Sequence, residues 1–102
     1  MKINVSGHHV DITDAIRKHV DEKFAKIASH YPSLLTLDVI ISKEHNRIYT
    51  EISTKYIGVH LSVKGEDDVM YPSIAMAAKK LDSALRHRKG QVKANKHEKI
   101  AG

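Results

Sequence analysis

The sequence has no cysteine, few aromatic residues (5%) and only five glycines in 102 positions. Without cysteine, a small protein held together by disulfides or by zinc thiolates is excluded. No apolar run approaches the ~18 residues that a membrane span needs. Residues 1–6 alternate like a strand and lack the apolar core of a signal peptide. We therefore expect a cytoplasmic protein that makes no membrane contact.

Catalytic motifs are also missing. The serines do not lie in a G-x-S-x-G turn, and the glycines are too scattered for a phosphate-binding loop. The pair Asp67-Asp68 is typical of a helix cap rather than of an acid–base site. His8 and His9 are adjacent in a strand, so their side chains point to opposite faces and do not chelate one ion. We expect no catalysis, no cofactor, no functional metal site and no small-molecule substrate.

The charge is unevenly distributed along a chain of ordinary globular composition, with 41% hydrophobic and 28% charged residues. From Lys79 onward, eight Lys and Arg stand against two acids, a net charge of +6, whereas the nine basic and ten acidic residues before Lys79 sum to −1. Basic residues clustered on one segment favour a polyanionic partner such as nucleic acid. The alternative is a solvated basic face that only keeps the protein soluble.

Apolar spacing predicts the order strand, helix, three strands, helix. Period-2 alternation covers residues 1–6, 35–42, 48–55 and 59–64, with a loop over 43–46. A helix capped by Thr13 is predicted up to Pro32, with an apolar stripe at Ile16, Val20, Phe24, Ile27 and Tyr31. A second helix follows a turn over 65–68 and is expected to stop at Gly90.

These elements predict an α+β two-layer sandwich of order β-α-β-β-β-α. Two roughly parallel helices would cover one face of a four-stranded antiparallel sheet, as in double-stranded-RNA-binding domains. Residues 1–90 form the single domain, and residues 91–102 are expected to be a basic, flexible tail.

The helices carry the basic residues in a pattern that suits RNA. On the second helix Lys79, Arg86 and Lys89 recur on one side, and Lys80 lies on the other flank. The outward sheet positions offer only Tyr49 as an aromatic, whereas a platform for stacking single-stranded bases uses two or three. Cationic helices suit the phosphate backbone of folded, A-form RNA.

Two segments resemble the bacterial ribosome hibernation factors. The first segment is residues 10–27. The second lies around the last helix and is represented by Gly65, Met70-Tyr71, Ile74 and Lys80-Leu81. The resemblance is to the short, hibernation-promoting form, in the family that includes ribosome-associated inhibitor and sigma-factor modulation proteins. It implies binding to the small ribosomal subunit and its rRNA in stationary phase or under stress, where the protein occupies the place of messenger and transfer RNA. It also implies cooperation with a ribosome modulation factor to form inactive ribosome dimers.

The short form fits because 102 residues leave no room for the extra C-terminal domain of long members, and because the tail is short and basic. The alternatives are the related inhibitor that stabilises single 70S ribosomes, a generic double-stranded-RNA-binding module and a regulator that acts through protein contacts. The resemblance and the basic stripe together predict a set of rRNA-binding residues, Arg17, Lys23, Lys26, Lys79, Lys80, Arg86, Arg88 and Lys89.

Overall fold

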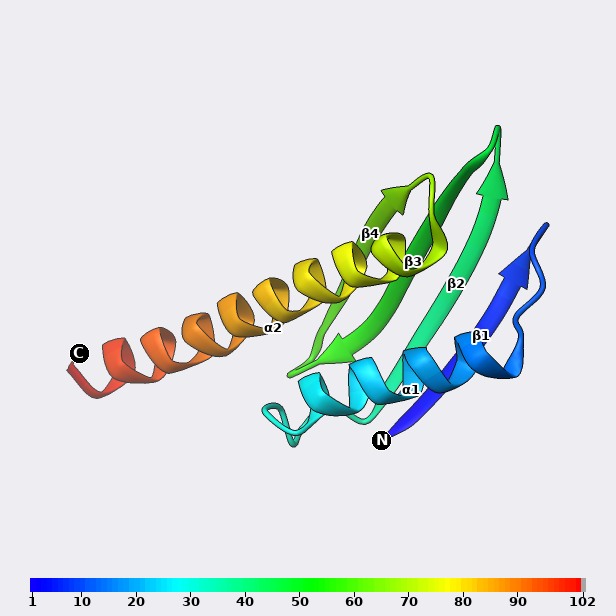
Figure 1. The fold of residues 1–102 in the computed structure, drawn as a ribbon. Coiled ribbons are helices and arrows are strands. Elements are labelled where there is room, and N and C mark those ends of the chain that lie inside the picture. The colour runs from blue at the N-terminus through cyan, green and yellow to red at the C-terminus, as the bar shows by residue number, and fades with distance from the viewer. Residues whose placement is uncertain (102) are drawn as a thin grey trace.

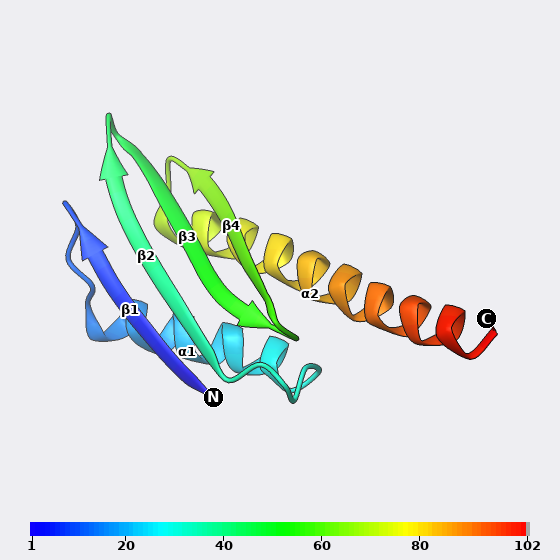
Figure 2. The ribbon, with the colours of Figure 1, turned by 180° about the vertical axis from the view of Figure 1, so that it is seen from behind.

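The computed structural model describes residues 1–101, with side chains described for residues 1–91. It contains β1 (Lys2–His8), α1 (Asp14–Ala28), β2 (Thr36–Glu44), β3 (Arg47–Tyr56), β4 (Val59–Asp67) and α2 (Met70–Ala101). Both helices lie on one face of the sheet and run roughly parallel (Figure 1), and no helix covers the opposite face (Figure 2). The predicted two-layer β-α-β-β-β-α fold is confirmed. In the part of the chain described, neither helix is both long enough and apolar enough to cross a membrane.

The sheet is mixed, with strand order β1-β2-β3-β4. β2, β3 and β4 pair antiparallel as expected, but β1 pairs parallel with β2, so the prediction of a fully antiparallel sheet is wrong at this edge. The reason is the connection: α1 carries the chain back to the end at which β1 began, and a helical crossover joins parallel strands. In the parallel pair, Val5 lies beside Val39.

The core lies between the sheet and the two helices, where the predicted alternation places the apolar side chains. The largest fully buried apolar residues are Val20, Phe24, Leu37, Val39, Ile41, Ile52, Ile74, Leu81 and Leu85. Thr13 accepts a hydrogen bond from the backbone N–H of Ile16 at 3.2 Å, which confirms the predicted N-cap of α1.

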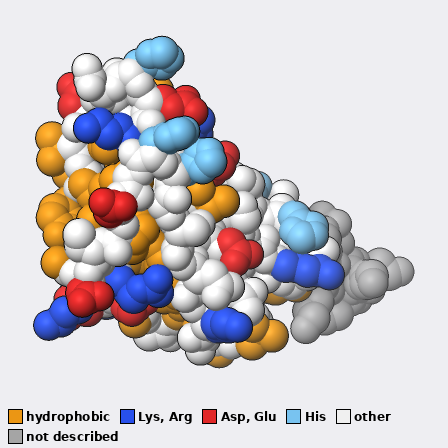
Figure 3. All heavy atoms as spheres, turned by 90° about the vertical axis from the view of Figure 1, so that its right-hand side faces the viewer, with side chains coloured by type: hydrophobic (Ala, Val, Ile, Leu, Met, Phe, Trp, Pro, Cys, Tyr) orange, Lys and Arg blue, Asp and Glu red, His pale blue; other side chains and the backbone are white. Residues whose placement is uncertain are grey.

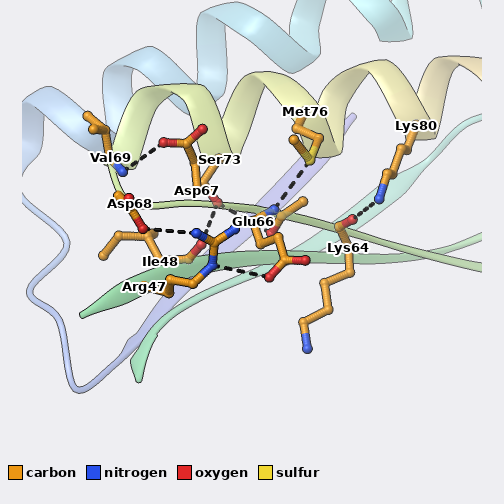
Figure 4. A network of polar contacts seen from close by, with 11 residues as sticks. Arg47, Ile48, Lys64, Glu66, Asp67, Asp68, Val69, Ser73, Met76 and Lys80 are labelled. Carbon is orange, nitrogen blue, oxygen red and sulfur yellow. Dashed lines mark hydrogen bonds and ion pairs between the residues drawn. The ribbon is translucent and has the colours of Figure 1, made fainter. Parts of the chain in front are cut away.

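The contact between α2 and the β3–β4 pair is unusually close. A Cβ placed on Gly65 of β4 would lie 2.4 Å from the backbone oxygen of Ser73 and 2.5 Å from the backbone nitrogen of Ala77. Ser73 is itself fully buried, and its hydroxyl lies 3.0 Å from the Thr50 hydroxyl and donates to the Ile48 carbonyl at 3.1 Å. Small residues on both elements therefore bring the helix backbone against the strand, and the buried hydroxyls are satisfied by hydrogen bonds (Figure 4).

Three predicted boundaries before α2 are wrong. Gly65 pairs with Thr50 inside β4 rather than lying in a turn. The β2–β3 loop is shorter than expected, because His45 and Asn46 both take positive φ values (50° and 63°) and form a tight two-residue turn. α1 ends at Ala28, before Pro32, where the backbone N–H of Ser29 donates to the Ala25 carbonyl.

α2 does not stop at Gly90 but continues to Ala101. Nothing in its surroundings forces an end there, since a Cβ on Gly90 would meet no atom within 4 Å. The predicted boundary between domain and tail therefore falls inside a helix. The side chains of the predicted tail from residue 92 onward, and Gly102, lie outside the described residues.

Replacing Gly65 with alanine should destabilise the protein by about 1–3 kcal/mol or more, because the new methyl group meets backbone atoms that cannot move aside without shifting α2. Urea unfolding monitored by circular dichroism measures the change.

The matched substitution Gly90→Ala should stabilise the protein by about 0.5–1 kcal/mol, because alanine is the better residue inside a helix and the position is open. A loss of stability in Gly90→Ala would instead mean that α2 ends at this glycine. If Gly65→Ala unfolded at the same urea concentration as the unsubstituted protein, the close contact with α2 would be refuted.

Candidate nucleic-acid interface

A groove of about 960 Å³ separates α1 from α2. Lys23 and Lys26 of α1 line one side, and Lys79 of α2 lines the other. The groove is also lined by small or aliphatic side chains, namely Ala25, Ile27, Ala75 and Ala78. Because the two helices run roughly parallel (Figure 1), basic side chains from segments far apart in the sequence face the same space.

A smaller hollow of about 390 Å³ adjoins the groove further along α2. Arg86 and Lys89 of α2 line it, together with His30 and Tyr31 from the segment after α1. Asp82 lines both the groove and the hollow, so the two are neighbouring parts of one surface. We call it the interhelical surface, and its polar members are His19, Glu22, Lys23, Lys26, His30, Tyr31, Lys79, Asp82, Arg86 and Lys89.

Asp82 organises the polar contacts of the hollow. Its Oδ2 pairs with Arg86 Nη2 at 2.6 Å, one helical turn away. Its Oδ1 accepts a hydrogen bond from the Tyr31 hydroxyl at 3.3 Å. Burial raises the pKa of the Tyr31 hydroxyl, and the negative charge of Asp82 raises it further. Lys89 Nζ lies 5.7 Å from the centre of the Tyr31 ring, within cation–π range.

The remaining predicted residues lie elsewhere. Lys80 Nζ donates to the Lys64 carbonyl at 2.8 Å, over β4 (Figure 4), and Arg88 Nη2 donates to the Ile57 carbonyl at 2.8 Å, at the β3–β4 turn. Both therefore lie on the flank of α2 that faces β4. Arg17 is exposed one turn before Asp21, which lies on the flank of α1 away from α2. The structure brings five of the eight predicted residues together and separates these three.

Elsewhere among the described residues 1–91, positive charge is in several places mixed or paired with negative charge (Figure 3). On the side of the molecule that faces the viewer in Figure 3, acidic and basic side chains are interspersed. At the neighbouring strand ends, Arg47 pairs with Glu66 at 3.4 Å and with Asp68 at 2.9 Å (Figure 4). On the outer face of the sheet, Lys64 lies 4.6 Å from the centre of the Tyr49 ring. The interhelical surface is thus suited to a polyanion by its concentration of lysine and arginine.

Sequence reasoning missed the link between Tyr31 and Asp82. Tyr31 was assigned to the apolar stripe of the first helix, and its ring is indeed buried. Its hydroxyl, however, reaches a residue that is 51 positions away in the sequence. The spacing of Asp82 and Arg86 by four residues was a visible signal for an ion pair, whereas no sequence signal pointed to the tyrosine.

The fold and the interhelical surface define a small α+β domain whose helix layer is basic. The family model described as "Sigma 54 modulation protein / S30EA ribosomal protein" matches residues 3–93. The chain belongs to this family, which makes it a ribosome-associated factor and confirms the resemblance stated above.

Individual relatives agree with this assignment. The chain is 30% identical to a ribosome hibernation promoting factor of Azotobacter vinelandii, over 99% of this chain and 95% of that protein. It is 33% identical to one of Pseudomonas putida, over 87% of each. Among solved structures, a ribosomal subunit interface protein from Coxiella burnetii superposes with a TM-score of 0.83 at 23% identity, covering 88% of this chain and 99% of that one. The N-terminal domain of Thermus thermophilus Protein Y gives a TM-score of 0.74 at 28% identity, covering 84% and 93%.

The raised pKa of Tyr31 predicts a pH dependence of stability. The pKa of a tyrosine in the unfolded state is about 10, and the pKa of Tyr31 in the folded state is higher. Such a group contributes stability at pH values below its unfolded pKa, and this contribution is lost as the pH rises through its folded pKa. The unsubstituted protein should therefore lose more stability above a pH of about 10 than Tyr31→Phe does. Urea unfolding at a series of pH values measures the difference, with Tyr49→Phe on the outer sheet face as the matched control. Parallel curves for Tyr31→Phe and the unsubstituted protein would contradict the assignment.

Proposed function

We propose that this protein is a hibernation factor that binds the small ribosomal subunit at the decoding region. There its body would take the space of messenger RNA and transfer RNA, so that translation stops by occupancy and no bond is broken. As a ribosome-bound factor it would act in the cytoplasm, in stationary phase or under stress. The observation that carries the proposal is the interhelical surface of a member of this family, where lysines from both helices line one groove and Arg86 and Lys89 line the adjoining hollow.

The partner we propose is the phosphate backbone of rRNA. Lys23 and Lys26 line one side of the groove and Lys79 lines the other, so a phosphate backbone lying in the groove would meet positive charge on both sides. Single-stranded bases are a weaker candidate, because binding by stacking needs several exposed aromatic rings. Among the described residues, Tyr49 is the aromatic residue that the sequence places on the outer face of the sheet. Folded RNA recognised through its shape and backbone fits the helix layer better.

Within the proposed rRNA-binding set we distinguish two groups. Lys23, Lys26, Lys79, Arg86 and Lys89 belong to the interhelical surface and would make the main contacts. The other group is Arg17, Lys80 and Arg88, which would contact rRNA only at the margins. Lys80 and Arg88 already donate hydrogen bonds to backbone carbonyls of this chain, and each such bond would have to be exchanged for one to a phosphate.

Co-sedimentation with separated small and large subunits at two salt concentrations tests the proposal. We expect salt-sensitive retention on the small subunit alone, because each phosphate contact releases counterions. Messenger RNA together with initiator transfer RNA should displace the protein. Retention on neither subunit, or equally on both, would contradict binding at the decoding region. Competition by plain RNA duplexes as strong as by subunits would instead support a generic double-stranded-RNA-binding module.

A charge reversal at two positions of the interhelical surface, Lys79→Glu with Lys89→Glu, should weaken small-subunit binding at least tenfold and lower the salt slope by about two. The matched control reverses two exposed strand lysines, Lys43→Glu with Lys55→Glu, and changes the net charge by the same amount. If both double variants lost affinity equally, net charge rather than this surface would carry the binding. Reversal of Lys80 alone should cost less than reversal of Lys79 alone.

We further propose that the protein acts with a ribosome modulation factor to promote inactive ribosome dimers. The support for this is the similarity of the chain to proteins named ribosome hibernation promoting factor. Sucrose-gradient profiles of ribosomes with added modulation factor distinguish this role from that of a ribosome-associated inhibitor. More ribosome dimers on addition of the protein would support the proposal. Fewer dimers, with more single 70S particles, would support the inhibitor.

A further inference from the structure

An acidic residue lies in the middle of the interhelical surface. Asp82 lines both the groove and the hollow, between the lysines of the one and the cations of the other. If the surface served only to attract a polyanion, a carboxylate at this place would be a disadvantage, because it repels phosphate and neutralises a neighbouring cation. Glu22 also lines the groove, but it makes no ion pair among residues 1–91, whereas the Asp82 carboxylate contacts two side chains. These contacts indicate that Asp82 has a role other than attraction.

The contacts of Asp82 suggest that role. Its carboxylate joins Arg86, whose side chain is 74% exposed, to Tyr31, which is only 5% exposed. The Tyr31 ring is held in the core edge-to-face against the ring of Tyr56, with centroids 5.8 Å apart and an interplanar angle of 86°. A rigid core residue therefore holds the carboxylate, and the carboxylate holds the arginine.

An ordered arginine binds phosphate better than a freely moving one. An exposed arginine samples many rotamers, and it loses that freedom when it binds. The ion pair with Asp82 engages Nη2 of Arg86. A guanidinium has five N–H donors in a fixed fork, so donors remain for a phosphate while the pair is intact.

We propose that Asp82 is a positioning residue, which holds Arg86 beside Lys89 so that the hollow presents an ordered pair of cations to an rRNA phosphate. This inference rests on the proposed function. It makes a prediction opposite in sign to that of simple electrostatics. Removing a negative charge from a phosphate-binding surface should strengthen binding if charge alone matters, and should weaken binding if the charge orders Arg86.

The decisive variant is Asp82→Asn. It removes the charge but keeps an oxygen that can accept the Tyr31 hydroxyl, so the contact with the core is retained. We expect its affinity for isolated small subunits to fall by about threefold to tenfold, although the net positive charge has increased. Asp82→Glu, which restores the charge four residues before Arg86, should bind within about twofold of the unsubstituted protein.

Glu22→Gln is the matched control for charge. Glu22 lines the same groove, and the structure gives its side chain no ion pair among residues 1–91. Removing the charge of Glu22 should strengthen small-subunit binding slightly, and the dependence of the affinity on salt concentration should not become weaker. Opposite signs for Asp82→Asn and Glu22→Gln would support positioning.

A double-mutant cycle excludes a merely structural effect. If Asp82 acts through Arg86, then Asp82→Asn should no longer weaken binding in a protein that already carries Arg86→Ala. A general loss of folding would weaken binding in both backgrounds, and the urea midpoint of each variant is measured alongside.

Three outcomes overturn the inference. If the unsubstituted protein binds small subunits and Asp82→Asn binds as tightly or more tightly, positioning by Asp82 is refuted while the proposed function stands. The same holds if Asp82→Asn weakens binding equally with and without Arg86. If the unsubstituted protein fails to bind small subunits at all, the proposed function is refuted and this inference with it.

Discussion

The close approach of α2 to β4 is the constraint on which the rest of the structure depends. Gly65 lets the helix backbone reach the strand, and Ser73 fills the contact with a hydroxyl that is satisfied by Thr50 and Ile48. The position of α2 on the sheet then fixes how far it stands from α1. Because α1 reaches the sheet through longer side chains such as Phe24, a groove remains between the helices rather than a sealed seam.

Once α2 is fixed in this way, its three flanks face different surroundings. Leu81 and Leu85 on one flank are fully buried in the core. Lys79 on a second flank faces the groove, whereas Lys80, the next residue, reaches the Lys64 carbonyl at β4. Adjacent lysines therefore differ in what they can bind, because successive residues on a helix are rotated by 100°. Charge counted along the sequence does not distinguish them.

The sequence was sufficient to predict the elements, their order and the core, because periodicity is a local property. Val20 and Phe24 on the helix and Val39 and Ile41 on the strand are buried as their spacing indicated. Features that depend on tertiary contacts were not predictable. Gly65 looked like a turn residue, since nothing local indicates that a helix passes over it. Five of the eight predicted basic residues lie on the interhelical surface, but the placement of Lys80 and Arg88 depended on which flank of α2 faces β4.

Order as well as charge determines how well a surface binds phosphates. A cluster of exposed lysines attracts a polyanion over a distance, but each flexible side chain loses conformational freedom on contact. In the proposed binding mode the interhelical surface would combine both effects. Lys23, Lys26 and Lys79 would supply the attraction in the groove, while in the hollow Asp82 would reduce that attraction but hold Arg86 against Tyr31 of the core. Of the two acids on this surface, Glu22 makes no ion pair among residues 1–91, whereas Asp82 links an exposed arginine to a buried tyrosine, so in the proposed mode only Asp82 trades electrostatic attraction for a fixed geometry.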